Sequence, residues 1–321
     1  MPDWIGGDGH TTAETYRLMA ENQLRGVSAS YERLCLAVAG RADVCALIDR
    51  LPVAKRQPNL LLGAVRYLDG PVDDSDRFCA FLLEQWPAVE QVMRTHATQT
   101  NEPGRCATLL PQLALLDGPL ALLEVGASAG LCLFPDRYGY DYSGTTLGEG
   151  TPRLRCELTG AVPERLPDVR WRGGLDLNPL DVTSDEDVRW LESLVWPEQD
   201  ARFATLREAV TVARADPPRG VAGDLTRDVA ALALQAPADA TLVIFHSAVL
   251  AYVPPAGREQ LYDTIRALRE ARPTVWLANE AAGVVPGTAD VDAPSHSFVL
   301  ARDGEPVALT GPHGQSYRAL G

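Results

Sequence analysis

The stretch that decides the fold reads Ala121-Leu122-Leu123-Glu124-Val125-Gly126-Ala127-Ser128-Ala129-Gly130. An apolar run ends in an acid, and two glycines four residues apart follow with only small residues between them. This order predicts a buried strand, a tight turn and the start of a helix. Small residues let backbone N–H groups approach a ligand closely, and a helix N-terminus favours a carboxylate or phosphate group. We therefore expect this glycine turn to contact a cofactor.

Length and charge restrict the class of protein. The chain has 321 residues, enough for one large α/β domain or for one such domain with an appended subdomain. A formal net charge of −14 argues against a nucleic-acid partner, because phosphate binding needs a basic surface. No apolar run is long enough to cross a bilayer, and residues 1–4 lack the order of a signal peptide. We expect a small-molecule substrate, no nucleic acid and no membrane.

The cysteines predict reduced thiols in the core of a cytoplasmic protein, because none forms a C-x-x-C pair and most lie in apolar surroundings. We therefore expect no metal site. The six are Cys35, Cys45, Cys79, Cys106, Cys132 and Cys156.

The hydrophobic pattern changes near residue 119. Before it, apolar residues recur at helical spacing and prolines separate the segments. Helices are predicted over residues 12–38, 43–51, 58–68, 74–85 and 88–98. From residue 120, strand-like runs alternate with helical ones. We predict a helical subdomain over residues 1–119 and an α/β domain over residues 120–321.

The second part predicts a mostly parallel sheet covered by helices on both faces. Strands are predicted over residues 120–125, 153–159, 169–177, 241–245 and 275–277, with a short strand ending at Gly223-Asp224; helices are predicted over 186–194, 199–215 and 256–271. The segments Phe298–Ala301 and Pro306–Thr310, joined by Asp303-Gly304, predict a closing antiparallel hairpin.

Polar residues end the predicted strands, and the carboxyl ends of parallel strands are where open sheets bind ligands. Glu124 is placed to accept a ligand ammonium group, with a structural hydrogen bond to the turn as the alternative. Asp176 and Asp224 are candidates for a ribose diol and an adenine amine, or else for turn and cap positions. His246 is a candidate general base, and its alternative is a buried histidine with satisfied hydrogen bonds.

With these elements, the C-terminal two thirds resembles a class I S-adenosylmethionine-dependent methyltransferase. The resemblance rests on Leu122–Gly130 as the glycine-turn motif, Gly223-Asp224 after the third strand, and Thr241–Val253 as the fourth strand and its loop. It implies a Rossmann-like sheet and S-adenosylmethionine as cofactor. The residues expected to bind that cofactor are Glu124, Gly126, Ser128, Gly130, Asp176 and Asp224.

The whole chain is similar to a bacterial family named domain of unknown function 2332. This similarity supports the fold more than any activity. The matching segments are Gln99–Glu102, Arg105, Leu122–Asp136 with Arg137-Tyr138, Gly174–Asp181, Leu194–Pro197, His246–Val253 and Pro312–Gly314.

Two features depart from the methyltransferase pattern. Ser128 stands where the commoner turn has glycine, at some cost in backbone freedom. The ribose-binding acid usually lies about 20 residues past the turn, whereas Asp176 lies far beyond it. We infer a β-rich insertion over residues 138–168. Asp141 is the rival ribose acid on spacing, and Asp176 is preferred because it ends an apolar strand.

The resemblance implies methyl transfer to a small molecule. His246 and Glu280 are the expected bases, and Tyr252 and Tyr138 are expected to shape an aromatic face near the cationic sulfonium. Other alkyl chemistry on the same cofactor, such as cyclisation of its aminoalkyl chain, stays open.

The polar segment over residues 100–105 precedes the glycine turn by about one helix. Asn101, Glu102 and Arg105 are expected to contact substrate or to form part of a lid. The alternative is a capped turn between helices.

Two other functions stay open on the sequence. An NAD- or nucleotide-binding enzyme would use the same turn, but it would need three glycines and an acid at ordinary spacing, which the chain lacks. A non-catalytic protein would keep cofactor binding and lose the chemistry.

Overall fold

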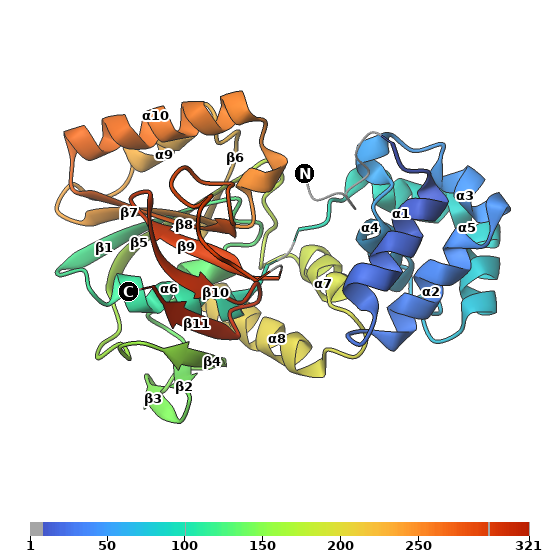
Figure 1. Ribbon diagram of the computed structural model, residues 1–321, viewed down its shortest axis with the longest axis horizontal. Helices are drawn as coiled ribbons and strands as arrows, with labels where there is room; N and C mark the ends of the chain where they lie inside the picture. Colours follow the sequence, from blue (N-terminus) through green and yellow to red (C-terminus); the bar gives the residue numbers. More distant parts are fainter. Residues whose placement is uncertain (1–8, 100, 295, 321) are drawn as a thin grey trace. The chain divides into compact units, whose positions relative to one another are not determined.

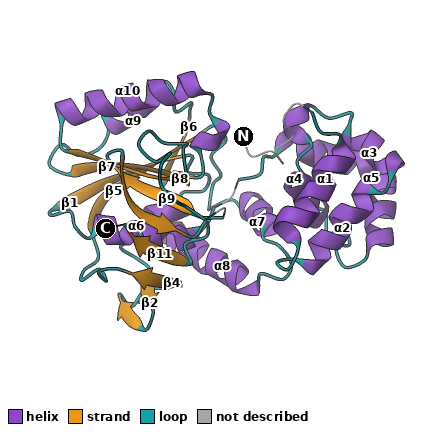
Figure 2. Ribbon diagram, in the orientation of Figure 1, coloured by secondary structure: helices purple, strands orange, loops and turns teal. Residues whose placement is uncertain are grey.

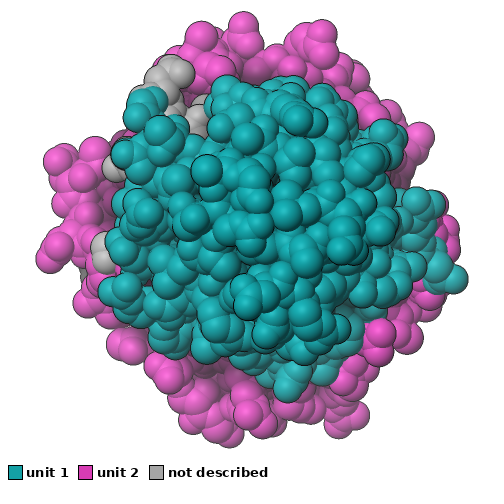
Figure 3. All heavy atoms as spheres, turned by 90° about the vertical axis from the view of Figure 1, so that its right-hand side faces the viewer, with its two compact units in different colours: residues 1–100, 185–204 teal, residues 101–184, 205–321 magenta. Residues whose placement is uncertain are grey.

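The structure is a computed structural model that describes residues 9–99, 101–294 and 296–320. The chain divides into two compact units, one of residues 1–100 and 185–204 and the other of residues 101–184 and 205–321, coloured separately in Figure 3. This boundary differs from the predicted one at residue 119. Helix α6 (Cys106–Leu113) contacts strand β4 (Arg153–Thr159) of the second unit, and helix α7 (Asp185–Leu194) contacts α4 (Pro58–Tyr67) of the first.

The described residues of the first unit form helices joined by loops, and the strands of the structure lie in the second unit (Figure 2). The predicted helix over 12–38 is interrupted by a π-turn and a loop, whereas the two predicted over 74–98 form one helix with a kink at Gln85. Pro87 explains the kink, because proline lacks an N–H donor and clashes with the preceding turn. Besides α4 and α7, the elements are α1 (Thr12–Met19), the π-turn (Ala20–Leu24), α2 (Ala29–Ala39), α3 (Ala42–Ile48), a 3₁₀ turn (Val53–Lys55) and α5 (Ser75–Thr95).

The second unit is built on one mixed sheet of eleven strands, in the order β3-β2-β4-β11-β10-β9-β8-β7-β1-β5-β6 (Figure 1). The predicted α/β class and the closing hairpin, β9 with β10, are confirmed. Besides β4, the strands are β1 (Pro119–Val125), β2 (Gly139–Tyr142), β3 (Thr145–Leu147), β5 (Asp168–Asp176), β6 (Arg219–Ala222), β7 (Thr241–Ser247), β8 (Thr274–Ala281), β9 (Phe298–Arg302), β10 (Glu305–Thr310) and β11 (Ser316–Ala319).

Five neighbouring strands of this sheet, β6, β5, β1, β7 and β8, are parallel. The chain begins this block at β1 in its centre, extends to β5 and β6 on one side, and then returns to β7 on the other side of β1. In open α/β sheets, ligands bind at the carboxyl ends of the strands where the order reverses in this way. The topology therefore places the glycine turn, which follows β1, at the expected ligand edge.

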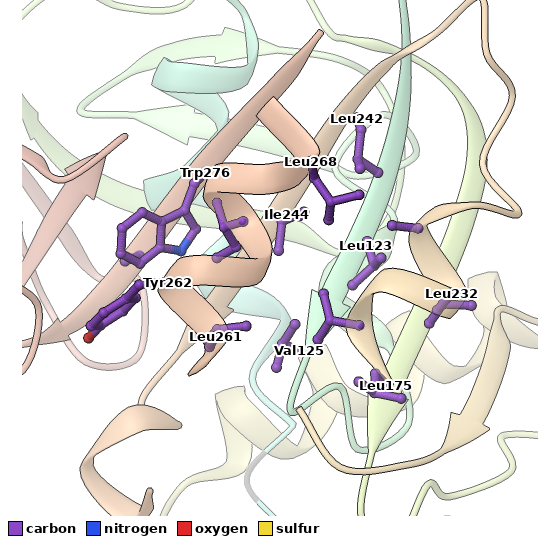
Figure 4. Close-up of a cluster of buried hydrophobic side chains, with 14 of the residues drawn as sticks. Leu123, Val125, Leu175, Leu232, Leu242, Ile244, Leu261, Tyr262, Leu268 and Trp276 are labelled. Atoms are coloured by element: carbon purple, nitrogen blue, oxygen red, sulfur yellow. The ribbon is translucent and has the colours of Figure 1, made fainter. Parts of the chain in front are cut away.

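One face of the parallel block is buried beneath α9 (Val229–Ala233) and α10 (Pro255–Ala271). Figure 4 shows Leu123, Ile244 and Trp276 from the strands among Leu232 of α9 and Leu261 of α10. Burial of each large aliphatic side chain stabilises the fold by roughly 1.5–3 kcal/mol. The continuous apolar runs of β1 and β7 thus form the centre of the core.

The stretch after β1 differs from the prediction, because the glycine turn does not begin an α-helix. Residues 131–133 form only a single 3₁₀ turn, and the chain then enters β2. Pro135 explains the early stop, since the residue before a proline is driven out of the helical region. Strands β2, β3 and β4 lie within the β-rich insertion inferred over residues 138–168. The connection from β1 to β5 is therefore held by side chains rather than by a packed helix.

A buried ion pair fixes this connection to β5. Arg172 of β5 donates to Asp136 at 2.7 Å, and their side chains are 7% and 13% exposed. Arg172 also donates to the Leu133 carbonyl, and its guanidinium lies 4.9 Å from the centre of the Phe134 ring. Removing one partner of such a pair leaves the other charge without compensation.

We expect Asp136→Ala to lower the free energy of unfolding by about 3 kcal/mol, because it strands the buried Arg172 charge. The matched control is Asp117→Ala, which breaks the exposed pair with Arg165 and is expected to cost less than about 1 kcal/mol. Urea denaturation of both variants measures the difference. An equal loss of unfolding free energy in the two variants would show that Asp136 is not needed to stabilise the Arg172 charge.

Candidate functional site

The glycine turn uses its backbone amides inside the protein. Gly126 and Ala127 donate their N–H groups to the Leu175 carbonyl at 2.8 and 3.2 Å, and Ser128 donates to Asp176 Oδ2 at 2.8 Å. We expected these three amides to contact a ligand. In the structure they instead attach the turn to the end of β5. The turn is a rigid structure at the edge of the sheet rather than an open phosphate cradle.

Asn101 fastens the turn from the other side. Its side-chain amide donates to the Ala127 carbonyl at 2.8 Å, and its Oδ1 accepts from the Leu131 N–H at 3.0 Å. Both functional atoms of this predicted lid residue are thus bonded to the turn. Asp176 likewise accepts a second backbone bond, from Asn178 at 2.9 Å. The structure gives Asn101 and Asp176 clear structural partners in addition to any role toward a ligand.

Gly126 and Gly130 both have positive φ, +74° and +70°, which a side chain rarely adopts. A Cβ at Gly126 would also overlap a methyl group of Val249. Substitution of Gly126 by valine would therefore strain the core directly. Loss of ligand binding in that variant would not identify a ligand contact.

A pocket of about 380 Å³ lies beside the turn. Of the six predicted cofactor residues, Ser128 and Gly130 line it. The hydroxyl oxygen of Ser128 is buried and has no hydrogen-bond partner in the structure. The full lining is Ala127, Ser128, Ala129, Gly130, Leu133, Gly174, Pro179, Leu180, Asp181, Val182, Thr183, Pro217, Pro218 and Gly220.

The loop after β5 supplies pocket residues that the sequence analysis did not single out. Pro179, Leu180 and Asp181 follow the predicted ribose acid within five residues. Asp181 Oδ1 accepts from the N–H and hydroxyl of Thr183, and these bonds lower its pKa. The signal was present in the sequence, because a loop that follows a buried strand at the ligand edge is a natural pocket wall.

His246 lies in the interior instead of at an open edge. Its side chain is fully buried, its Nδ1 lies 2.7 Å from Glu280 Oε1, and its Nε2 accepts from Trp276 Nε1 at 3.0 Å. Because an indole N–H can only donate, Nε2 is the acceptor and the proton sits on Nδ1. Both ring nitrogens are occupied, which is the arrangement of a satisfied buried histidine. This geometry leaves no nitrogen open to a substrate.

Glu280 joins His246 to the loop after β7. Its Oε1 also accepts from the N–H groups of Val249 and Leu250 at 2.9 and 3.1 Å, while its Oε2 is buried without a partner. Val249 in turn packs on Gly126. The buried histidine and glutamate therefore position the loop that packs on the glycine turn.

Glu124 is the buried acid at the end of β1. The residue is 7% exposed and its Oε2 has no partner. Strand alternation places it on the sheet face opposite His246, because Glu124 pairs in register with Phe245. Burial raises the pKa of Glu124 well above its ordinary value, and the nearby Cys132 adds to the shift while Arg105 opposes it. Burial therefore favours the neutral form of this acid.

Arg105 and Glu102 belong to a segment that packs against the turn before β11. Arg105 donates to the carbonyls of Pro312 and Ser247 at 2.9 and 3.0 Å. Glu102 accepts from the Gly104 N–H, and one of its oxygens lies 3.4 Å from Nδ1 of His313. Both predicted lid residues are buried and serve this packing. Their observed contacts agree with the alternative interpretation of this segment, a capped turn between helices.

The remaining predicted residues are Tyr138, Asp224 and Tyr252, and they differ in exposure and in hydrogen bonding. Tyr138 is fully buried and donates to the Leu131 carbonyl at 2.7 Å, so it does not form a ligand face here. Asp224 accepts from the N–H and hydroxyl of Thr226, which lowers its pKa. Tyr252 is 54% exposed, yet desolvation still raises the pKa of its hydroxyl. Among the residues expected to take part in methyl transfer, Tyr252 is exposed, whereas His246 and Glu280 are buried.

A family model described as "Uncharacterized protein conserved in bacteria (DUF2332)" matches residues 13–318. The chain belongs to this family. The match confirms the similarity inferred from the sequence and spans both units. Comparison with curated proteins gives no match. The roles of residues in this DUF2332 protein therefore rest on its geometry.

Three further observations concern the helices, the potential metal ligands and the cysteines of the DUF2332 protein. None of the described helices is long and apolar enough to cross a membrane. Within residues 9–99, 101–294 and 296–320, no group of three or more His, Cys, Asp or Glu side chains is arranged to hold a metal ion. All six cysteines are free thiols.

We expect Asp176→Ala to lower the free energy of unfolding by about 3 kcal/mol, because the Ser128 and Asn178 amides lose a charged acceptor. Asp141→Ala is the matched control. Asp141 accepts an exposed hydrogen bond from the Gly144 N–H and lies 4.0 Å from the exposed Arg155, so its replacement should cost about 1 kcal/mol. Denaturant unfolding gives both values. If S-adenosylmethionine binds, we expect its affinity to fall more in Asp176→Ala than in Asp141→Ala. The reverse order of affinities would favour Asp141 as the ribose acid.

We expect His246→Ala to destabilise the protein by about 3 kcal/mol, because Glu280 and Trp276 both lose a buried partner. His296→Ala, at an exposed position, is the control and should be nearly neutral. Thermal unfolding measures both. Unchanged stability together with a 10²–10⁴-fold fall in turnover, roughly the range for general bases, would restore His246 as a general base.

Proposed function

We propose that the DUF2332 protein binds S-adenosylmethionine at the carboxyl edge of its parallel strands and transfers the methyl group to a small molecule. The strand order supports this proposal. Glu124, Asp176 and Asp224 follow or end β1, β5 and β6, three adjacent parallel strands. The chain reverses its direction of growth beside β1, and open sheets bind nucleoside ligands at this position.

Glu124 provides the observation that fits the cofactor. Its Oε2 is buried and has no partner, although burial of an unpaired polar atom costs about 1–3 kcal/mol. The ammonium group of the cofactor would supply the missing donor and the opposite charge. A cation there would also favour the ionised carboxylate, whose pKa burial raises. Glu124 is therefore the residue on which the proposed binding depends.

The bound cofactor supplies an electrophilic methyl group on its sulfonium. The chain then has to orient an acceptor in line with that carbon and exclude water. His246 and Glu280 serve this task indirectly, because they hold Val249 and Leu250 in place. Tyr252, in the same loop, offers a half-exposed aromatic ring to the cationic centre.

The glycine turn gives less support to NAD or another nucleotide. Phosphate cradles rely on free amides that lead into a helix N-terminus. Here the amides of Gly126, Ala127 and Ser128 are bonded to β5, and a 3₁₀ turn replaces the helix.

Binding of S-adenosylmethionine without methyl transfer would instead identify the protein as a non-catalytic cofactor-binding protein.

The test is calorimetric titration and thermal unfolding with S-adenosylmethionine, its demethylated product and NAD. At about 100 times its dissociation constant, the cofactor should stabilise the protein by roughly 2.7 kcal/mol. Glu124→Gln should weaken binding by about 1.5–3 kcal/mol, because the charge-assisted bond is lost. Glu157→Gln, at an exposed position of β4, is the control.

Absence of heat and of any melting shift with both sulfur compounds would overturn the proposal. Stabilisation by NAD alone would favour the nucleotide enzyme. Equal affinity in Glu124→Gln and the wild type would remove Glu124 from the site.

A further inference from the structure

We infer that the guanidinium group of Arg105 binds the carboxylate of a small organic acid at the carboxyl edge of the sheet. The proposed function names no acidic ligand, so this inference goes beyond it. The carboxylate can belong to the methyl acceptor or to the cofactor, and both sources offer the same chemistry to a guanidinium. Arg105 binds such a group whether or not the protein binds S-adenosylmethionine.

Arg105 is a buried cation without an anionic partner in the described part of the chain. The residue is 7% exposed, and its hydrogen bonds run to two uncharged oxygens, the carbonyls of Pro312 and Ser247. Arginine stays protonated in proteins, and charged side chains are almost never buried unless they are paired. A buried guanidinium that lacks a carboxylate therefore indicates a negatively charged ligand group.

Arg172 is the comparison within the same unit. Its side chain is also 7% exposed, and it donates to the Leu133 carbonyl much as Arg105 donates to the Pro312 carbonyl. In addition, the carboxylate of Asp136 lies 2.7 Å from Arg172 and balances its charge. Arg105 has the carbonyl contacts without the acid. The fold thus supplies an anion to one buried arginine and leaves the other to a ligand.

The buried acid Glu124 does not balance the charge of Arg105. Burial raises the pKa of Glu124 and so favours its neutral form, while Arg105 opposes the rise. Oε2 of Glu124 has no hydrogen-bond partner, so it does not accept from the guanidinium. A neutral Glu124 leaves Arg105 uncompensated, and a Glu124 paired with a cationic ligand leaves it uncompensated as well.

Arg105 keeps N–H donors for a ligand. A guanidinium has five N–H donors. Nε donates to Pro312 and Nη1 donates to Ser247, so both N–H groups of Nη2 and one of Nη1 remain. Nη2 accordingly has no acceptor among the described residues, yet it is not one of the polar atoms buried without a partner, as Nη1 of Arg66 is. Nη2 therefore retains accessible surface.

The surroundings of the guanidinium combine aromatic rings with a polar strand end. Tyr252 is 54% exposed; desolvation raises the pKa of its hydroxyl and the nearby Arg105 opposes the rise, so the site opens beside an exposed residue. The Phe298 ring centre lies 5.9 Å from the guanidinium carbon. The hydroxyl of Ser247 accepts from Nδ2 of Asn279 at 3.0 Å and keeps its own O–H to donate.

A single guanidinium beside one hydroxyl suits a carboxylate better than a phosphate. Arginine binds a planar carboxylate through two parallel N–H···O bonds. Phosphate sites commonly use free backbone amides at a helix N-terminus, but the amides of Gly126, Ala127 and Ser128 are bonded to β5. The net charge of −14 also opposes a doubly charged ligand more than a singly charged one.

The first measurement follows thermal unfolding of the full chain with sodium acetate, acetamide or inorganic phosphate at equal ionic strength. We expect acetate to raise the melting temperature more than acetamide, its uncharged counterpart. Phosphate stabilises folded proteins in general, so the effect of each salt is compared between the wild type and Arg105→Gln. This variant should weaken acetate binding by about tenfold or more, because a charge-assisted pair is lost.

Arg258→Gln is the matched control. Arg258 also donates to two carbonyls, those of Val253 and Val284, but it is half-exposed. Its replacement removes the same kind of contact and should leave acetate binding as in the wild type. Arg105→Lys keeps the charge without the planar fork and should retain part of the binding. If Arg105→Gln does not fold, Arg105→Lys takes its place in the comparison.

The second measurement identifies the source of the carboxylate by comparing S-adenosylmethionine with its decarboxylated analogue. If the cofactor supplies the group, the wild type binds S-adenosylmethionine about tenfold more tightly than the analogue, Arg105→Gln removes this difference, and S-adenosylmethionine displaces acetate. If a separate substrate supplies it, Arg105→Gln leaves the affinity for both compounds unchanged, and acetate binds alongside S-adenosylmethionine.

The inference is wrong if acetate stabilises the wild type no more than acetamide does, or if it stabilises Arg105→Gln as much as the wild type. A larger loss of phosphate binding than of acetate binding in Arg105→Gln would overturn the assignment to a carboxylate. Failure of S-adenosylmethionine and its analogue to bind, with acetate behaving as expected, would overturn only the proposed function.

Discussion

The end of β5 holds the glycine turn, and the candidate sites depend on that attachment. The Leu175 carbonyl accepts two turn amides, and the Asp176 carboxylate accepts a third. Backbone donors fixed in this way cannot also bind a ligand, so the turn acts through its shape and its side chains. Glu124 before the turn and Ser128 within it then become the polar groups of interest. Both have a buried oxygen with no partner.

The parallel sheet separates the buried polar residues by face. His246 and Glu280 lie on the face covered by α10, where Trp276 completes their hydrogen bonds. Glu124 lies on the opposite face, in register with Phe245 and Gly174. A strand delivers successive side chains to opposite faces, so residues at one edge of a sheet need not share one site. This separation joins the histidine, through Glu280, to the loop after β7 and leaves Glu124 on the other face at the carboxyl end of β1.

The loss of a helix after the turn has consequences elsewhere in the second unit. The Arg172–Asp136 ion pair holds the connection that such a helix would otherwise pack. Where that helix would begin, Ala127 packs directly on Gly174 of β5, and Leu133, Gly174 and Gly220 line the pocket beside the turn. In place of a helix, the connection is therefore fixed by an ion pair that is largely shielded from solvent.

The sequence by itself determined the α/β class, most strand and helix positions and the closing hairpin, because apolar periodicity and turn residues act locally. The order of residues around the glycine turn also made Glu124 and Ser128 candidate site residues, and that prediction stays open. Only the tertiary structure decided that His246 is buried between Glu280 and Trp276, that Asn101 and Asp176 fasten the turn, and that Asp181 lines a pocket. These facts depend on which partners the folded chain brings to each side chain. The hydrogen-bonded partners lie 26 to 48 residues away in the sequence, where no local pattern of residues can specify them.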